Sequence, residues 1–463
     1  MATRKEHDLL GEMDVPDEAL YGIQTLRALE NFDVSGHKIS SFPDFIRSLA
    51  WIKKSAALAN SQLGVVPRNI ADAICQACDE IIDGKHHDQF PVEAIQGGAG
   101  TSTNMNANEV IANRALEIMG HKRGEYQYCH PNNHVNCSQS TNDAYPSALR
   151  LALYVMLGRL MDDVQYLAEG FQKKGDEFAH VIKMGRTQLQ DAVPMTLGME
   201  FHAYANTLGE EIARLNEARK LALEVNMGAT AIGTGICAPK GYREEIVRKL
   251  AEVSGLPVVS SANLVEATWD TGCYVQISGT LKRTATKLSK ICNDLRLLSS
   301  GPRTGINEIN LPRRQPGSSI MPGKVNPVIP EMINQICFDI MGKDVTIAIA
   351  SEAGQLELNV MEPIIVFCLF MGIERLGKGM RVLRDRCIDG ITANEERCRE
   401  LVEHSIGIVT ALLPYIGYEQ ASSIAKEALE KGESALKLAE ERKLLDKEQI
   451  DRIMAPENML QSY

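Results

Sequence analysis

The sequence predicts a mainly helical protein built around a bundle of long helices. Apolar residues recur at three- and four-residue spacing over unusually long stretches, which is the pattern of amphipathic helices. Aromatic residues make up only 5% of the chain. Because alternating β-branched residues are also scarce, strands are expected to be few and short.

Helical patterns follow one another along most of the chain. Residues 41–64 open with Ser and Pro and continue with apolar residues at helical spacing, as many helix starts do. Five longer segments follow in the middle of the chain, at about residues 147–181, 195–225, 279–298, 327–343 and 363–387. The best strand candidates are residues 9–21 and the region around Pro257. Five long helical segments indicate a bundle of extended helices.

The chain changes character after residues 391–394, where short, charged helical segments replace the long ones. We predict a mostly helical N-terminal domain (1–140), a central long-helix bundle domain (141–393) and a small C-terminal helical domain (394–463). A helix of about 35 residues is about 50 Å long, and residues 149–161 carry apolar side chains on more than one face. We therefore expect an oligomer; the alternative is a large monomeric bundle.

Charge and composition exclude several classes of protein. The 463 residues carry a net charge of −11, which argues against nucleic acid or an anionic membrane as the main partner. No apolar run approaches the roughly 20 residues that span a bilayer. The first 20 residues lack the apolar core of a secretory signal, so a cytoplasmic location is expected. The odd number of cysteines, eleven, fits reduced thiols better than a disulfide framework.

Two cysteine patterns have alternative interpretations. Cys75 and Cys78 form a CxxC pattern, but the surrounding residues are typical of a helix interior, which favours a structural role over redox or metal chemistry. Residues 129–137 contain two Cys and two His at a spacing seen in zinc sites. The flanks of these four residues are rich in Asn and no further pair of Cys or His accompanies them, so no metal site is predicted.

Four small, polar segments stand out, at residues 96–110, 136–146, 184–198 and 317–327. In each of them hydroxyl and amide side chains gather where a helix is expected to begin. Helix N-termini offer free N–H groups and partial positive charge, which suit anions. If the four segments converge, they would hold a small dicarboxylate, with Lys324 as the fixed charge. The alternative is that each Ser, Thr or Asn only caps its own helix.

Cofactor-binding patterns are weak or missing. The glycines of residues 228–235 lack the GxGxxG spacing of a dinucleotide site, and GGAGTST has no lysine and is no P-loop. The sequence contains no HExxH or GxSxG motif. We therefore expect chemistry without a cofactor.

The segment GSSIMPGKVNP, residues 317–327, resembles the signature of the aspartase/fumarase superfamily. The other three polar segments resemble the remaining regions of that signature, in the same order, and the resemblance covers essentially the whole chain. It implies three largely helical domains, of which the central long-helix bundle forms the core of a homotetramer. It also implies active sites formed where segments from three subunits meet.

Three positions distinguish the branches of the superfamily. Class II fumarases typically read GSGTQTN where this chain has GAGTSTN, carry His at the position of Gln188, and have NVFKP in place of NVMEP (359–363). The resemblance therefore implies the ammonia-lyase branch, which converts L-aspartate reversibly into fumarate and ammonia. The alternatives are a class II fumarase and a non-catalytic member that has kept only the fold.

The resemblance also implies residue roles. Ser318 is expected to be the general base that takes a proton from the carbon beside the β-carboxylate. The implied contacts are Thr101, Ser140, Thr141 and Ser319 around the β-carboxylate, Thr187, Lys324 and Asn326 at the α-carboxylate, and Asn142 and Gln188 at the amino group. No cofactor is implied, although some relatives are activated by a divalent cation. Gly317 and Gly323 would let the Ser318 segment open and close over the substrate.

Overall fold

The computed structural model describes residues 2–455. These residues form two compact units, and each unit combines three separate stretches of the chain. Unit 1 comprises Met1–Met161, Ala213–Arg283 and Asp339–Arg375, and unit 2 comprises Asp162–Ile212, Thr284–Phe338 and Leu376–Tyr463. The sequence predicted three consecutive domains. The two discontinuous units do not test those boundaries, which stay a prediction.

Helices dominate both units, as predicted. They are α1 (Ile23–Asn31), α2 (Pro43–Gln62), α3 (Arg68–Ile82), α4 (Thr101–Ile118), α5 (Thr141–Glu177), α6 (Leu197–Lys220), α7 (Tyr242–Ser254), α8 (Leu264–Trp269), α9 (Gly272–Leu298), α10 (Val328–Glu352), α11 (Glu362–Arg386), α12 (Glu395–Glu403), α13 (Val409–Lys431), α14 (Ala435–Glu441) and α15 (Lys447–Ile453). The five long helices α5, α6, α9, α10 and α11 correspond to the five long segments expected from the sequence.

The strands are short and pair two by two, as predicted. They are β1 (Thr3–Asp8) with β2 (Gly11–Pro16), β3 (Ile182–Thr187) with β4 (Gln190–Thr196), β5 (Glu224–Val225) with β6 (Val259–Ser260), and β7 (Ile309–Asn310) with β8 (Thr392–Ala393). Only the β5–β6 pair is parallel. The β3–β4 hairpin occupies most of the polar segment at residues 184–198 and was not predicted, whereas the helix expected at the end of that segment does begin there, as α6 at Leu197.

Helix α5 begins six residues earlier than its apolar pattern indicated, and it includes Pro146. A proline has no N–H to donate to the carbonyl four residues earlier, here that of Asn142. The Asn142 carbonyl instead accepts a hydrogen bond from Asn226 Nδ2 at 2.9 Å. This side-chain substitute satisfies the carbonyl and lets the helix start at Thr141.

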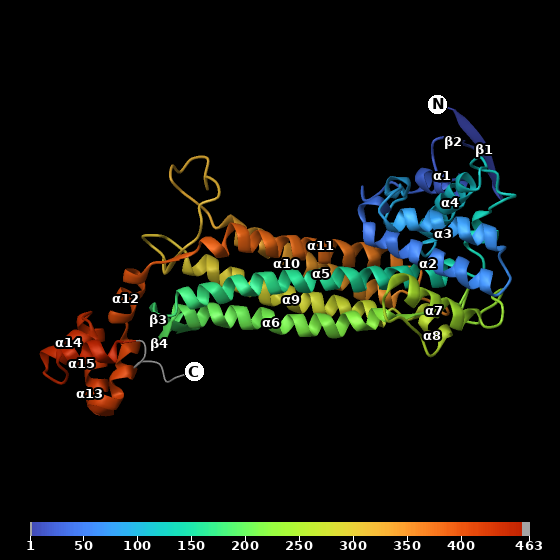
Figure 1. Ribbon diagram of the computed structural model, residues 1–463. Coiled ribbons are helices and arrows are strands. Elements are labelled where there is room, and N and C mark those ends of the chain that lie inside the picture. Colours follow the sequence, from blue (N-terminus) through green and yellow to red (C-terminus); the bar gives the residue numbers. More distant parts are fainter. Residues whose placement is uncertain (1, 456–463) are drawn as a thin grey trace. The chain divides into compact units, whose positions relative to one another are not determined.

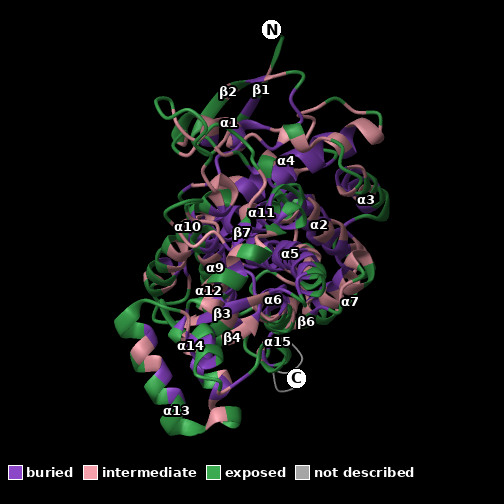
Figure 2. Cartoon of the chain, turned by 90° about the vertical axis from the view of Figure 1, so that its left-hand side faces the viewer, coloured by how far each residue is buried: buried purple, intermediate pink, exposed green. Residues whose placement is uncertain are grey.

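The core of unit 1 is built on α2, α3, α4 and the first part of α5. Helices α2, α3 and α4 lie side by side (Figure 1). Residues 143–153 of α5 are all buried, and buried residues are purple in Figure 2. The Phe45 ring packs edge-on against Tyr145 and Phe370, with ring centroids 5.3 and 5.5 Å apart. These contacts join α2, α5 and α11 within unit 1.

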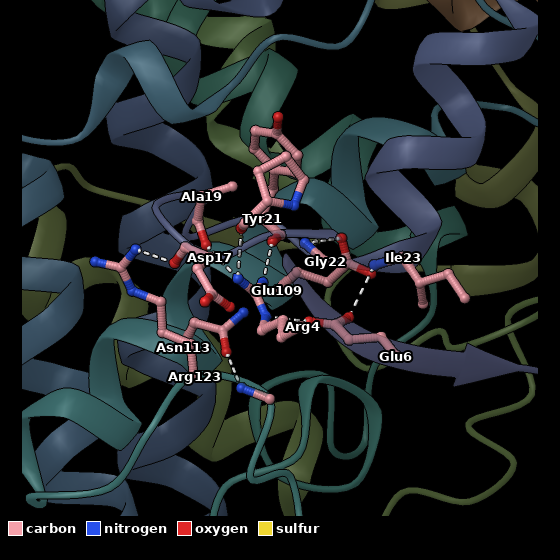
Figure 3. A network of polar contacts seen from close by, with 12 residues as sticks. Arg4, Glu6, Asp17, Ala19, Tyr21, Gly22, Ile23, Glu109, Asn113 and Arg123 are labelled. Carbon is pink, nitrogen blue, oxygen red and sulfur yellow. Dashed lines mark hydrogen bonds and ion pairs between the residues drawn. The ribbon is translucent and has the colours of Figure 1, made fainter. Parts of the chain in front are cut away.

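Buried carboxylates fix the start of α1 (Figure 3). Glu109 of α4 accepts hydrogen bonds from the backbone N–H groups of Gly22, Gln24 and Thr25 at 2.8, 2.8 and 3.1 Å. The carboxylate of Glu6 accepts a further bond from Ile23 N at 2.9 Å. The first N–H groups of a helix have no partner within the helix, so these carboxylates act as its cap. The N-terminal segment is thereby tied to α4.

Two apolar groups lie among the described residues of unit 2. Phe171 of α5 and Phe178, the residue that follows α5, pack against Phe201 of α6, with ring centroids 6.0 and 5.3 Å apart. The second group includes Val402, Leu412 and other buried residues of α12–α15. Among the described residues, no single helix is long and apolar enough to cross a membrane; only the bent pair of Glu395–Glu403 with Ile406–Lys431 passes by length and composition.

All eleven cysteines are free thiols. Cys75 and Cys78 lie inside α3, as predicted. Burial raises the pKa of the Cys75 thiol to about 11, and burial also raises the pKa of the Cys78 thiol well above its usual value. These thiols are therefore protonated at neutral pH and are poor nucleophiles.

Candidate active site

Thr101 is the first residue of α4 in unit 1. The preceding Gly100 has φ +90°, and a Cβ there would lie 2.4–2.6 Å from atoms of the Tyr145 ring. Only glycine therefore lets the start of α4 approach α5 so closely. The exposed Thr101 hydroxyl donates to the Gly98 carbonyl at 2.7 Å, so it has to rotate before it can donate to a ligand.

Residues 140–142 form the start of α5, also in unit 1. The Ser140 Oγ accepts a hydrogen bond from Asn142 N at 3.2 Å, as a serine does at a helix start. The Asn142 Nδ2 donates to the Ala231 carbonyl at 2.7 Å. The fully buried Asp143 accepts a bond from Ser140 N at 2.9 Å. These bonds hold the backbone of the segment in place.

Thr141 is supported by Asn104, which lies in the polar segment at residues 96–110, and by Lys53, which was not predicted from the sequence. The Thr141 Oγ1 accepts a hydrogen bond from the Asn104 Nδ2 at 3.1 Å, and Asn104 in turn contacts the buried ammonium of Lys53. In the sequence, Lys53 stands beside Lys54 and is typical of a solvated helix face. Only the placement of α2 against α4 brings it into the interior, so local sequence holds no signal for it.

Thr187 and Gln188 lie at the tip of the β3–β4 hairpin in unit 2. Thr187 pairs with Gln190, so the turn consists of Gln188 and Leu189, with φ +52° and +61°. Two positive φ values are typical of a type I′ turn, which normally uses Asn and Gly. Side chains other than glycine are strained in this conformation, and Leu189 is also 68% exposed. Strain and exposure together point to a functional turn rather than one selected for stability.

Buried ion pairs anchor this hairpin. Arg186, one residue before Thr187, donates to the Glu308 carboxylate at 2.8 Å. Lys183 of the same strand lies 3.0 Å from Glu308 and 2.6 Å from Glu200 of α6. Glu308 is fully buried, and the charged Arg186 and Lys183 offset the cost of burying its carboxylate.

The Ser318 segment forms a loop between β7 and α10 in unit 2. The loop is closed at its base, where Gly317 N donates to the Lys324 carbonyl at 2.7 Å and the Asn326 Nδ2 donates to the Gly317 carbonyl at 2.8 Å. Helix α10 begins at Val328, so the Asn326 amide nitrogen closes the loop two residues before the helix. Ser319 and Lys324 are exposed.

The Ser318 side chain is held by the backbone of its own loop. Its Oγ accepts hydrogen bonds from two backbone N–H groups, those of Ile320 at 3.2 Å and Met321 at 3.0 Å. Two N–H donors aimed at one oxygen stabilise negative charge on that oxygen. The arrangement therefore favours ionisation of the Ser318 hydroxyl.

The predicted site residues fall into two groups. Thr101, Ser140, Thr141 and Asn142 belong to unit 1, and Thr187, Gln188, Ser318, Ser319, Lys324 and Asn326 belong to unit 2. The two groups share a chemical character, because hydroxyls, amides, backbone N–H groups and one ammonium all suit carboxylates.

The zinc-like spacing in residues 129–137 has other partners. The His130 Nδ1 accepts hydrogen bonds from the N–H groups of Asn132 and Asn133, and the His134 Nδ1 accepts one from His130 N. Across residues 2–455 no group of three or more His, Cys, Asp or Glu side chains could hold a metal ion.

Two family models match this chain. The model described as Lyase matches residues 11–342, and the model described as Fumarase C C-terminus matches residues 408–461. The chain belongs to this lyase family. Its membership confirms the superfamily that the four polar segments predicted.

Curated members of the family are similar over nearly their whole length. The aspartate ammonia-lyase of Pseudomonas fluorescens is 61% identical over 458 residues, 99% of this chain and 96% of the relative. That of Helicobacter pylori (strain J99) is 59% identical over 460 residues, 99% of this chain and 98% of the relative. That of Escherichia coli (strain K12) is 54% identical over 458 residues, 99% and 96% of the two chains.

Solved structures of lyases share the fold. A fumarate lyase:delta crystallin from Brucella melitensis, bound to cobalt, is 54% identical with a TM-score of 0.96 and covers 99% of this chain and 100% of its own. A class II fumarase from Schistosoma mansoni is 36% identical with a TM-score of 0.91 and covers 98% of each chain. The mainly helical fold of this family member is therefore that of the fumarate lyases.

Proposed function

We propose that this chain converts L-aspartate reversibly into fumarate and ammonia. The observation that carries the proposal is the identity of 54–61% to aspartate ammonia-lyases over 99% of this chain. The class II fumarase is only 36% identical. The ammonia-lyase branch also agrees with Gln188 and with the NVMEP segment at 359–363.

Ser318 is the general base in this proposal. Its ionised Oγ removes a proton from the β-carbon, and the electron pair of the broken C–H bond moves into the β-carboxylate. The resulting aci-carboxylate carries two negative charges. Its electrons then form the carbon–carbon double bond of fumarate, and the C–N bond breaks to release ammonia. The N–H groups of Ile320 and Met321 support the role of Ser318, because they stabilise its ionised form.

The remaining residues bind different parts of the substrate. Hydroxyl donors suit the β-carboxylate, because several short hydrogen bonds stabilise the charge that develops there. The proposed donors to the β-carboxylate are Thr101, Ser140, Thr141 and Ser319. The α-carboxylate is held by Thr187, Lys324 and Asn326. The amino group is bound by Asn142 and Gln188. The exposed ammonium of Lys324 supplies charge, and amide and hydroxyl groups supply direction.

The proposed assembly is a homotetramer in which segments of three subunits complete each site. Large apolar side chains in unit 1 support association between chains: Val345, Ile349 and Leu356 are 58%, 63% and 85% exposed in the single chain. Exposed apolar side chains of this size are typical of protein interfaces when they cluster. The proposed reaction takes place in the cytoplasm and requires no cofactor, although a divalent cation is a candidate activator.

The proposal is tested by substrate choice. Purified protein is mixed with L-aspartate, and fumarate is followed by its ultraviolet absorbance; a second reaction contains L-malate. We expect absorbance to rise with L-aspartate, with release of one ammonia per fumarate, and not with L-malate. A signal with L-malate alone would identify a fumarase, and a signal with neither would contradict both activities.

A further inference from the structure

A buried lysine lies behind the start of α5 in unit 1. Lys53 of α2 is fully buried. Its Nζ donates to three amide oxygens, those of Asn104 at 2.7 Å, Asn136 at 2.9 Å and Gln139 at 2.9 Å. An ammonium group has three hydrogens, and each one has a partner here. A buried charge with all of its donors satisfied is held in one position.

The ammonium fixes the orientation of the amides around it. Because it can donate but not accept, the oxygen of each amide has to face Lys53. The Nδ2 of Asn104 therefore points away from Lys53, and it donates to the Asn136 Oδ1 at 3.2 Å and the Thr141 Oγ1 at 3.1 Å. A reversed Asn104 amide would place N–H groups against the ammonium, so Asn104 is held as a donor to Thr141.

The Thr141 hydroxyl has a defined direction as a result. Its oxygen accepts the bond from Asn104, so its own hydrogen is available to another acceptor. Thr141 is 9% exposed and is the first residue of α5, where helix N–H groups also favour an anion. The Thr101 hydroxyl differs, because its hydrogen is already donated to the Gly98 carbonyl.

We propose that Lys53 is a positioning residue that acts through Asn104 to turn the Thr141 hydroxyl hydrogen toward the substrate carboxylate. The inference rests on the proposed function, because it needs Thr141 to contact the substrate. Negative charge grows on the β-carboxylate in the transition state, and a donor oriented in advance stabilises that charge without reorganisation. The positive charge of Lys53 also strengthens the chain of hydrogen bonds that ends at Thr141.

Burial and the neighbouring charge of Asp143 act on the Lys53 ammonium in opposite directions. Asp143 of α5 is fully buried, and its carboxylate attracts the ammonium of Lys53. Burial lowers the pKa of Lys53 to about 7, and the charge of Asp143 opposes that shift. Cys78 of α3 is neutral, because burial raises the pKa of its thiol.

The test is a double-mutant cycle between Asn104 and Thr141. Asn104→Asp keeps an oxygen for Lys53 but replaces the Nδ2 donor with an acceptor, so the Thr141 hydrogen turns inward. Thr141→Val removes the hydroxyl, and loss of one oxyanion donor lowers kcat by about 10²–10³-fold. We expect Asn104→Asp to lower kcat by about 10²-fold with KM changed less than threefold. The double variant should lie within about threefold of Thr141→Val, because both changes remove the same interaction.

Lys53→Met removes the ammonium that orients the Asn104 amide. In the Thr141→Val background, this substitution should cause no further fall in kcat. Because this variant leaves three buried amides without a donor, it is the one at risk of not folding, and Asn104→Asp carries the test in that case. The matched control is Asn113→Asp, the same substitution at a buried position of α4 whose Nδ2 bonds to the Leu20 carbonyl at 2.8 Å. It should lower the unfolding temperature without changing kcat.

The outcomes separate this inference from the proposed function. Turnover of L-aspartate by the wild-type protein is measured first, and its absence would contradict the proposed function. In an active background, two results would overturn the role of Lys53. One is an Asn104→Asp variant with kcat within threefold of wild type. The other is a double variant whose loss equals the product of the two single losses.

Discussion

The two groups of predicted site residues are held in different ways. In unit 1, Thr141 is nearly buried and rests on Asn104 and Lys53, whose bonds form as the core folds. In unit 2, the loop around Ser318 is mostly exposed, and hydrogen bonds within the loop close its base. Changes in the first group should therefore affect both folding and activity, whereas changes in the loop should affect mainly activity.

The largest effect is expected at the loop. Ser318→Ala removes the proposed base, and kcat with L-aspartate should fall by up to about 10⁴-fold, the upper range for loss of a positioned general base. The side chain buries little surface, so the free energy of unfolding should change by less than about 0.5 kcal/mol. Steady-state kinetics and urea denaturation of the same preparation check both parts. Activity within tenfold of wild type would remove Ser318 as the base.

Two glycines, Gly100 in unit 1 and Gly317 in the loop of unit 2, test whether the two groups are held differently. At Gly100 a Cβ would lie 2.4–2.6 Å from the buried Tyr145 ring, and at Gly317 it would lie 2.8 Å from Asn326 N and 2.9 Å from the Lys324 carbonyl oxygen. Gly100→Ala should lower the free energy of unfolding by about 3 kcal/mol, from overpacking of about 1–3 kcal/mol and the cost of about 1–2 kcal/mol for its positive φ.

Gly317→Ala should lower the free energy of unfolding by only about 1 kcal/mol, the contribution of a hydrogen bond in an exposed loop. Its Cβ breaks the bonds at the base of the loop, and a displacement of about 1 Å can cost about 10²-fold in activity. Thermal unfolding and kcat/KM are measured on both variants. Equal losses of stability in the two variants would show that the loop is part of the folded core.

Much of this fold follows from sequence, because long helices leave a strong periodic pattern. The five long segments and the start of α2 depend on local spacing that the chain itself displays. The β3–β4 hairpin was missed, since Gln188 and Leu189 are unusual residues for a turn with two positive φ values. Its stability comes from distant partners such as Glu308, which bonds to Arg186 across 122 residues of chain.

The candidate site, like the fold, was predictable from the sequence only in part. The hydroxyl and amide segments were visible, because small polar residues next to glycine and proline interrupt an otherwise helical sequence. Lys53 was not visible, because a lysine on an amphipathic helix is normally solvated. The burial of Lys53 depends on the positions of Asn104, Asn136 and Gln139, which lie 51 to 86 residues away along the chain.

The smallest effect in this series is expected at Lys324. Lys324→Met removes the exposed ammonium but keeps much of the side-chain length. If Lys324 binds the α-carboxylate equally in the ground and transition states, KM should rise about 10–100-fold, the equivalent of about 1.5–3 kcal/mol for a hydrogen bond to a charged group. The value of kcat should stay within about threefold, because uniform binding does not alter the barrier from the bound state.

Lys426→Met, which removes an exposed lysine of α13, is the control for net charge and should change neither constant. A fall in kcat with unchanged KM would instead place Lys324 beside the charge that develops in the transition state, and the loop would then supply both the base and its electrostatic support.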